Sequence, residues 1–321
     1  MQWAVLLRLL LLSVCASFSS SAAVCDETRP PTGLGDRLTV FWGACALARV
    51  RNDTLRSLWR PHARDDPHPA VDVSALVLPS SCYLTTSFYG PVLRSLCRVY
   101  ARRCAGVSPG CDTYLSLLDT QHGWLLAAWP SAVASRFDVP VSLDTLAATY
   151  RAVARETRLG VPYDTDAAAL QRLRNATCVH LRSTDKMAEG QAANAVETSE
   201  AEWQELREWS LAYLRVAQSP AVFVIGDDAR RAALYVRDAR RLGLVLLDLP
   251  VPSFAATDAG ARVLLDLQRL AACAEIVLVA KFSSFALSAS LMGGGRLVLG
   301  RLAGEAPQAQ RWMELGTIRV H

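Results

Sequence analysis

The sequence predicts an α/β protein with two lobes, the second of which holds a parallel β-sheet. The chain has 321 residues, 51% of them hydrophobic, which is enough for two modest domains with cores of their own. From about residue 161 onward, short apolar runs alternate with helical patterns, and such alternation favours right-handed βαβ crossovers. The segment before it is irregular. We therefore expect an N-terminal domain at 26–160 and a C-terminal domain at 161–321.

The expected strands of the C-terminal domain are short apolar runs bounded by turn residues. They lie at 177–181, 221–225, 244–247, 276–280 and 297–299. The first helix between them opens at Ser199 with the capping box S-E-A-E and ends before Pro220. Further helices are expected at 229–242, 263–271 and 283–292.

The N-terminal domain has weaker patterns. Helical periodicity occurs at 38–50, 92–104 and 143–158, and the run at 73–78 has the composition of a strand. The sequence G-L-G-D-R-L at 33–38 lacks the third glycine and the preceding strand of a dinucleotide-binding fingerprint, so it does not predict NAD binding.

Residues 1–23 have the pattern of a secretory leader, with Arg8 ahead of an apolar stretch that is shorter than the ~20 residues of a spanning helix. A cleaved signal peptide and a short signal anchor both fit. Outside the leader eight cysteines remain, and some of them should pair in an oxidising compartment. The nearest in sequence are Cys97, Cys104 and Cys111. With two N-x-S/T sequons, at Asn52 and Asn175, we expect a glycoprotein of the Golgi or ER lumen, or a secreted one.

Charge and motif content exclude several other classes. The net charge of +4 is too small to indicate nucleic acid or an anionic membrane as a partner, which leaves the possible N-terminal anchor as the one membrane contact. No G-x-S-x-G occurs, which disfavours an α/β-hydrolase. The five histidines show no metal spacing, and the D-x-D at 164–166 is better explained as a helix N-cap. No metal or other cofactor is therefore expected.

Three turns of the C-terminal domain follow predicted strands and carry polar side chains. Because ligands of parallel sheets bind at the carboxyl ends of the strands, these turns should share one site. Their polar residues are His180, Arg182, Ser183, Asp185 and Lys186, then Asp227 and Asp228, then Ser283 and Ser284. Arginine and lysine suit phosphate, as do helix N-terminal amides. Each turn also has a structural explanation, either a surface pair of Arg182 with Asp185 or an ordinary helix cap.

Together the turns resemble elements of the GDP-fucose-dependent α1,6-, α1,2- and protein O-fucosyltransferases, most closely the α1,6 type. V-H-L-R-S-T-D-K (179–186) is similar to the family element H-x-R-R-x-D-K. The segment at 263–284, which contains Asp266 in L-L-D-L and ends in F-S-S, is similar to the third element of the family. V-F-V-I-G-D-D (222–228) is similar to the second element. G-L-G-D-R-L resembles the Gly-rich entry of the wider superfamily. The resemblance covers roughly 170–295 and implies a GT-B-like fold with a Rossmann-like C-terminal domain.

The resemblance also implies roles for individual residues. Arg182 would contact the β-phosphate and stabilise the leaving diphosphate without a metal. His180 and Asp185 would hold the donor loop, Asp266 would reach the guanine, and Ser283 and Ser284 would meet phosphate. The remaining donor-pocket candidates are Lys186, Asp227, Asp228 and the backbone at Gly33 and Gly35.

The sequence departs from the family pattern at two places. Ser183 stands where the family has a second arginine, which removes one positive charge. The carboxylate expected as general base falls on Gly190, so Glu189 becomes the nearest candidate and Glu197 a remote one. We expect an inverting transfer of fucose from GDP-fucose to a glycan or protein hydroxyl. The alternatives are another nucleotide sugar on the same scaffold, or a non-catalytic secreted glycan-binding relative.

Overall fold

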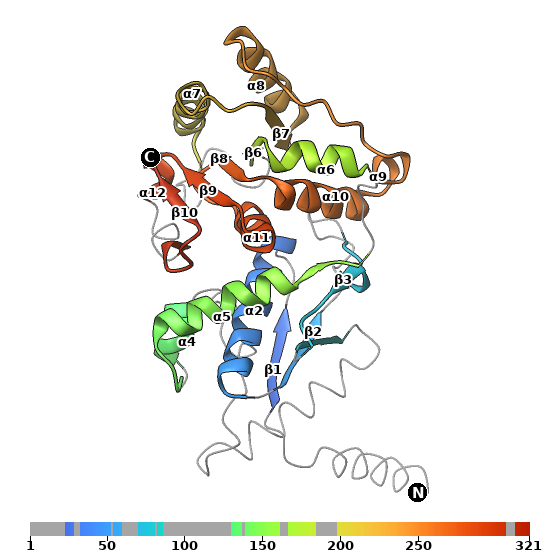
Figure 1. Ribbon diagram of the computed structural model, residues 1–321, viewed down its shortest axis with the longest axis vertical. Coiled ribbons are helices and arrows are strands. Elements are labelled where there is room, and N and C mark those ends of the chain that lie inside the picture. Colours follow the sequence, from blue (N-terminus) through green and yellow to red (C-terminus); the bar gives the residue numbers. More distant parts are fainter. Residues whose placement is uncertain are drawn as a thin grey trace, which may run out of the picture.

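The computed structural model describes residues 23–28, 33–52, 54–59, 70–80, 82–85, 130–136, 139–160, 166–183, 198–305 and 312–321. These residues form two lobes that follow one another along the long axis of the molecule (Figure 1). Each lobe has its own parallel sheet, so the predicted two-lobed α/β architecture of the GT-B kind is confirmed.

The sheet of the C-terminal lobe has parallel strands in the order β10-β9-β8-β6-β7. The strands are β6 (Thr177–Leu181), β7 (Val222–Gly226), β8 (Glu275–Val279), β9 (Arg296–Leu299) and β10 (Ile318–Val320). β6 and β8 are buried along their whole length, as continuous apolar strands covered on both faces should be. The parallel direction expected from the strand–helix alternation is confirmed.

The two edges of this sheet differ from the prediction. The apolar run at 244–247 forms only a single parallel bridge, between Leu246 and Val222. Val245 is 61% exposed there, and Pro250 and Pro252, which have no N–H to donate to a ladder, follow soon after. At the other edge β10 pairs with β9, although its short and largely exposed pattern does not mark a strand.

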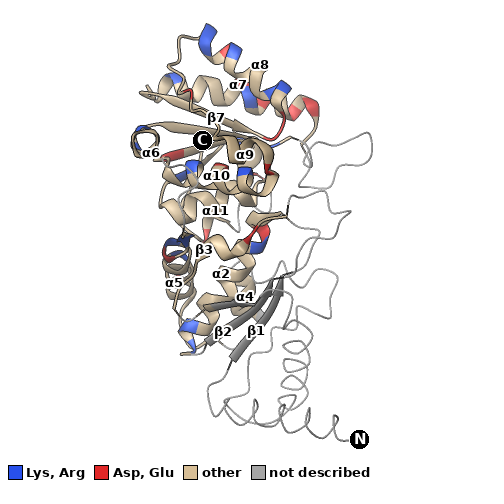
Figure 2. Cartoon of the chain, turned by 90° about the vertical axis from the view of Figure 1, so that its right-hand side faces the viewer, with Lys and Arg blue, Asp and Glu red and all other residues tan. Residues whose placement is uncertain are grey.

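Helices cover both faces of this sheet (Figure 2). α7 packs against β8 on one face, while α11 packs against β8 and β9 and lies beside α10. The predicted capping box is present, because Ser199 Oγ accepts from Glu202 N–H at 3.3 Å and Glu202 Oε2 accepts from Ser199 N–H at 2.8 Å. The helices are α6 (Ala167–Arg174), α7 (Glu200–Val216), α8 (Ala229–Arg241), α9 (Ser253–Thr257), α10 (Ala259–Ala272), α11 (Ser284–Gly293) and α12 (Arg301–Gly304).

The N-terminal lobe is more regular than its sequence pattern predicts. β1 (Ala23–Thr28), β2 (Thr54–Trp59) and β4 (Cys82–Thr85) form a parallel sheet. The predicted strand at 73–78 is instead a 3-10 turn (Val73–Ala75) and β3 (Leu76–Val77), which pairs antiparallel with β5 (Arg158–Leu159). The helices are α2 (Leu34–Val50), α4 (Pro130–Arg136) and α5 (Leu143–Glu156). The helix predicted at 92–104 lies outside the described residues.

α2 and α5 join the lobes, because both pack against α11 (Figure 1). α2 is buried on nearly every side, so it forms the centre of the molecule rather than its surface. Trp42 Nε1 on α2 donates to Thr157 Oγ1 at 2.9 Å, and Tyr150 OH on α5 donates to the carbonyl oxygen of Thr39 at 2.8 Å. These buried hydrogen bonds fix α5 against α2.

Among the described residues, two disulfides cross-link the chain. Cys45 on α2 is joined to Cys82 on β4, and Cys178 on β6 is joined to Cys273 after α10. The expectation that some cysteines pair is therefore confirmed, while Cys97, Cys104 and Cys111 lie outside the described residues. In the described part of the chain, no helix is both long and apolar enough to cross a bilayer.

Candidate functional site

The turns after β6, β7 and β8 meet at the carboxyl edge of the C-terminal sheet. β6 lies between β7 and β8, so the turn after β6 can contact both others. His180 Nδ1 lies 3.3 Å from Ser283 Oγ, which connects the end of β6 to the start of α11. On the other side, Arg182 forms an ion pair with Asp227, with 3.1 Å between Nη1 and Oδ2. One continuous polar site therefore joins the three turns.

Asp227 organises the turn after β6. Its Oδ1 accepts from the backbone N–H of Ser183 at 2.8 Å, and its Oδ2 pairs with Arg182. Both charged side chains keep about a fifth of their surface exposed, 22% for Arg182 and 18% for Asp227. The arginine is thus held in place but not sealed from solvent, which a group that binds an incoming phosphate requires.

Asp228 does not bind the turn after β6 as Asp227 does, but caps a helix. Its Oδ1 accepts from the N–H groups of Arg230 at 2.8 Å and Arg231 at 3.1 Å, so it is the N-cap of α8. The sequence allowed capping for at least one of these two acidic residues, and the structure assigns that role to Asp228. Asp166 likewise caps α6, which confirms the helix-cap interpretation of the D-x-D.

Two helix N-termini converge on this site. α11 begins at the buried Ser283, whose Oγ accepts from Ala286 N–H at 3.3 Å, and Ser284 is the first residue of the helix. α2 begins after Gly33, and its first turn packs on α11, where Ser288 Oγ donates to the carbonyl oxygen of Gly35 at 3.1 Å. Helix N-termini carry partial positive charge and free N–H groups, which favour anions.

Gly35 is required by this helix contact. A Cβ atom at Gly35 would lie 2.3 Å from the backbone nitrogen of Phe285, a distance that no side chain tolerates. Sequence resemblance assigned Gly33 and Gly35 to a backbone approach toward the donor. In the structure, the close approach at Gly35 is between α2 and α11, and Gly33 is the extended residue before α2.

Asp266 lies on α10, the helix beside α11. Arg262, one turn earlier, donates from Nε to both of its carboxylate oxygens, at 3.1 and 3.2 Å. Burial raises the pKa of the Asp266 carboxyl above its ordinary value, and Arg262 offsets only part of that rise. A carboxylate held in a largely desolvated place is disposed to accept hydrogen bonds from a ligand.

Some predicted residues lie outside the described residues, namely Asp185, Lys186 and Glu189. Their roles, including that of the general base, stay predictions. In the described ranges, no group of three histidine, cysteine or acidic side chains is arranged to hold a metal ion.

The sequence did not predict the burial of Ser183, and it did not draw attention to Arg37 or Lys281. Ser183 is buried, and its Oγ has no hydrogen-bond partner in the part of the chain that the structure describes. Arg37 is almost completely buried on α2, two residues beyond Gly35. Lys281, in the turn after β8, pairs with Glu202 of the α7 capping box at 2.6 Å. An arginine directly before the long apolar run of α2 was the signal that could have drawn attention to Arg37.

The chain matches no protein-family model and no curated protein sequence. It is similar to the solved structure of the fucosyltransferase NodZ from Bradyrhizobium, at 16% identity over 85% of this chain and 94% of that one, with a TM-score of 0.48. It is also similar to POFUT1 in complex with GDP-fucose, at 10% identity over 89% of this chain and 96% of that one, with a TM-score of 0.44.

A third similar structure is a mutant of Arabidopsis thaliana FUT1 in complex with GDP, at 11% identity over 87% of this chain and 70% of that one, with a TM-score of 0.49. NodZ is a fucosyltransferase, which is the class of enzyme whose motifs this chain resembles. Because these TM-scores are below 0.5, the roles of individual residues depend on the contacts of this chain.

Proposed function

We propose that the protein is an inverting fucosyltransferase, which transfers fucose from GDP-fucose to a hydroxyl of a glycan or glycoprotein. One observation carries the proposal. The H-L-R turn after β6 and the F-S-S turn after β8, which resemble two family elements, are in direct contact through His180 and Ser283. Sequence similarity alone does not require two distant motifs to meet, so their meeting at the carboxyl edge of a parallel sheet supports a common ligand.

The site has the groups that a nucleoside diphosphate needs. Arg182 supplies a guanidinium, and the N-terminus of α11 supplies N–H groups and a partial positive charge. In the proposed reaction, the acceptor oxygen forms a bond to C1 of fucose as the bond from C1 to the β-phosphate oxygen breaks on the opposite face. Negative charge grows on the departing GDP, and Arg182 stabilises it.

The acceptor proton needs a base, and the proposal gives that role to Glu189. The motivation is its place in the sequence, one residue before the position at which the family carries a carboxylate. Asp266 is proposed to accept hydrogen bonds from the guanine, because its carboxylate is buried beside α11.

Ser183 favours a second candidate function. A buried serine stands where the family has a second arginine, so the site holds one guanidinium fewer for the diphosphate. A non-catalytic secreted glycan-binding relative, or a transferase with another nucleotide sugar, would also fit such a loss.

A donor screen distinguishes these functions. The purified protein is titrated with GDP in a calorimeter, and GDP release is followed with GDP-fucose, GDP-mannose and UDP-sugars without acceptor. We expect GDP to bind and GDP-fucose to be hydrolysed slowly, with the other donors inert. GDP binding without release from any donor would favour the non-catalytic relative, and release from a different sugar would replace fucose.

We further propose that the protein resides in the secretory pathway. Two disulfides, Cys45–Cys82 and Cys178–Cys273, support an oxidising compartment. Asn52 and Asn175 are exposed, as glycan acceptors must be. Peptide mapping of the protein from its native source, without reduction, should recover both linked peptides, and four free thiols at these positions would contradict the proposal.

A further inference from the structure

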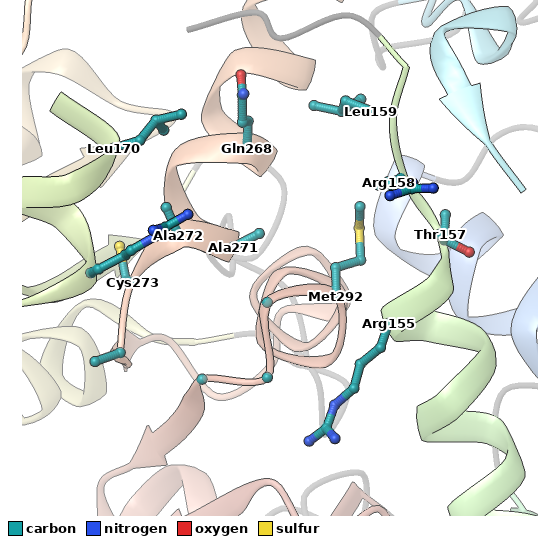
Figure 3. Close-up of a pocket in the computed structure, with 15 residues that line it drawn as sticks. Arg155, Thr157, Arg158, Leu159, Leu170, Gln268, Ala271, Ala272, Cys273 and Met292 are labelled. Carbon is teal, nitrogen blue, oxygen red and sulfur yellow. The ribbon is translucent and has the colours of Figure 1, made fainter. Parts of the chain in front are cut away.

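A pocket lies at the opposite edge of the C-terminal sheet from the three turns. Its volume is about 720 Å³. Cys273 and Ala274 line it just before β8, and Gly293–Gly295 line it just before β9, so it borders the amino ends of these strands (Figure 3). A strand of five residues separates the two edges by roughly 16 Å. The pocket is therefore distinct from the proposed donor site.

The charged side chains that line this pocket are all arginines: Arg155, Arg158 and Arg174. Arg155 and Arg158 are exposed and have no ion pair or hydrogen bond within the described ranges. Within the part of the chain that the structure describes, Arg174 donates to the neutral Gln171 at 3.2 Å and has no ion pair. A carboxylate is close by, but Glu156 is occupied by Arg49 of α2. The pocket thus carries positive charge that its own walls do not compensate.

Helix C-termini explain part of this charge. α5, α6, α10 and α11 all end at the pocket, and cations are favourable at the negative end of a helix. Arg155 and Arg174 lie in last turns and fit this explanation. Arg158 does not, because it belongs to β5. The guanidinium of Arg158 is therefore a positive charge beyond those that the helix ends favour.

The walls also accept hydrogen bonds. The last carbonyl groups of a helix receive no donor from within it, and the ends of α10 and α11 bring such carbonyls to the pocket. Leu159, Leu170 and Met292 add apolar surface between the polar groups (Figure 3). A bare inorganic anion would leave most of the volume empty, whereas the volume suits a small organic ligand.

We propose that this pocket binds an acidic sugar, one that carries a sulfate or carboxylate group. The oxyanion would be held by Arg155 and Arg158, whose planar guanidiniums match it with paired hydrogen bonds. The sugar hydroxyls would donate to the helix-end carbonyls, and the ring would rest on the apolar wall. The inference is independent of the GDP-fucose site, which lies at the other edge.

The pocket is built to keep this shape. The disulfide from Cys178 fixes Cys273 in its wall, and β5 is held by its pairing with β3. Gly294 ends α11 in the left-handed conformation with φ +74°, and a Cβ there would lie 3.5 Å from Arg155 Nε. Arg155 therefore already rests beside the glycine turn.

The test is calorimetry with the full chain at low salt, with a sulfated disaccharide, its desulfated form and inorganic sulfate as separate probes. The double variant Arg155→Gln, Arg158→Gln removes the proposed anion contacts at exposed positions, so folding should survive. Ala274→Glu places a negative charge at an exposed position of the wall. Arg240→Gln, at an exposed arginine of α8 outside the pocket, is the matched control.

We expect the sulfated disaccharide to bind the parent and the Arg240→Gln control equally. It should bind at least about tenfold more weakly to the double variant and to Ala274→Glu, since charge-assisted hydrogen bonds are lost or opposed. Equal binding to the parent and the double variant would overturn the proposal. So would equal affinity for the desulfated form, or an affinity for inorganic sulfate that matches that of the sulfated sugar.

Discussion

At the scale of single residues, Asp227 explains how the guanidinium of Arg182 can be held in position before a ligand binds. Without a phosphate present, Arg182 needs a counter-charge, and Asp227 supplies it while also binding the Ser183 N–H. Both side chains are mostly buried, so the guanidinium is held in a fixed position beside a carboxylate that is itself bound to a backbone N–H. The part of Arg182 that stays exposed, 22% of the side chain, is open to a diphosphate.

Asp266 gives a residue-scale prediction with a defined pH dependence. Its pKa is raised by burial, so the folded state binds the proton more tightly than the unfolded state. The stabilisation from the protonated form is complete below the ordinary Asp pKa of about 3.9 and is lost as pH rises through the higher folded value. Asp266→Asn mimics the neutral form, and its free energy of unfolding should exceed that of the parent at pH 7.

Thermal unfolding between pH 4 and pH 8 measures this difference, which should shrink toward the acid end. Arg262→Gln, which removes the carboxylate's partner, should shift stability in the opposite direction. The same Asp266→Asn variant should lose GDP affinity if the carboxylate meets the guanine. A variant that is less stable than the parent at pH 7 would show that the pair with Arg262 outweighs burial.

At the scale of elements, the N-terminus of α7 is connected to the proposed site. Glu202 closes the capping box of α7 and also pairs with Lys281 in the turn after β8. Burial opposes ionisation of Glu202, but Lys281 and the Ser199 N–H together hold the pKa of its carboxyl below the ordinary value. Ionised Glu202 therefore stabilises the fold above the unfolded pKa, and this contribution is lost as pH falls through the folded one.

Glu202→Gln should lower the free energy of unfolding by about 1 kcal/mol at pH 7, since a cap and a partly buried ion pair are weakened together. The deficit should shrink as pH falls below the ordinary Glu pKa of about 4.3, and it should vanish only at the acid end, below the lower folded pKa. Urea unfolding at pH 7 and at a series of acid pH values tests this. Glu305→Gln is the matched control, because Glu305 pairs with Arg301 in a fully solvated place, and an equal loss there would refute the assignment.

Elements with strong local signals could be predicted from the sequence. The apolar run of β6 and the capping box of α7 both have physical causes within a few residues. β1, β2 and β4 were not expected, because T-L-R-S-L-W in β2 mixes polar and apolar residues without a clear period. The run at 244–247 was predicted as a strand but forms only a single bridge. Apolar composition alone does not provide the continuous hydrogen bonds to a neighbouring strand that a full ladder needs.

At the scale of the whole molecule, Gly35 marks a point at which the backbones of the two lobes approach closely. Gly35→Ala should force α2 away from the backbone of α11 and lower the free energy of unfolding by about 3 kcal/mol. Gly160→Ala is the matched control, because its nearest neighbour, at 3.1 Å, is only the end of the Val77 side chain. Chemical denaturation of both variants provides the measurement, and similar losses would mean that the α2–α11 contact can relax.

The candidate site itself could be predicted only in part. Parallel strands bring the turns after β6, β7 and β8 to one edge, so their meeting followed from topology. The sequence did not predict which side chains would pair. In the structure Arg182, after β6, pairs with Asp227, after β7, while the neighbouring Asp228 caps α8. The pocket at the other edge has no motif, because its arginines come from separate elements that only the fold brings together.

The central claim is that the carboxyl edge of the C-terminal sheet binds and activates GDP-fucose through Arg182. The most direct measurement is turnover of GDP-fucose by Arg182→Ala, compared with the parent and with Arg207→Ala. The control also breaks a largely buried Arg–Asp pair, with Asp238, but lies between α7 and α8 away from the three turns. The account predicts a loss of ~10²–10³ in turnover for Arg182→Ala alone. Turnover within a few-fold of the parent, in a folded variant, would contradict it.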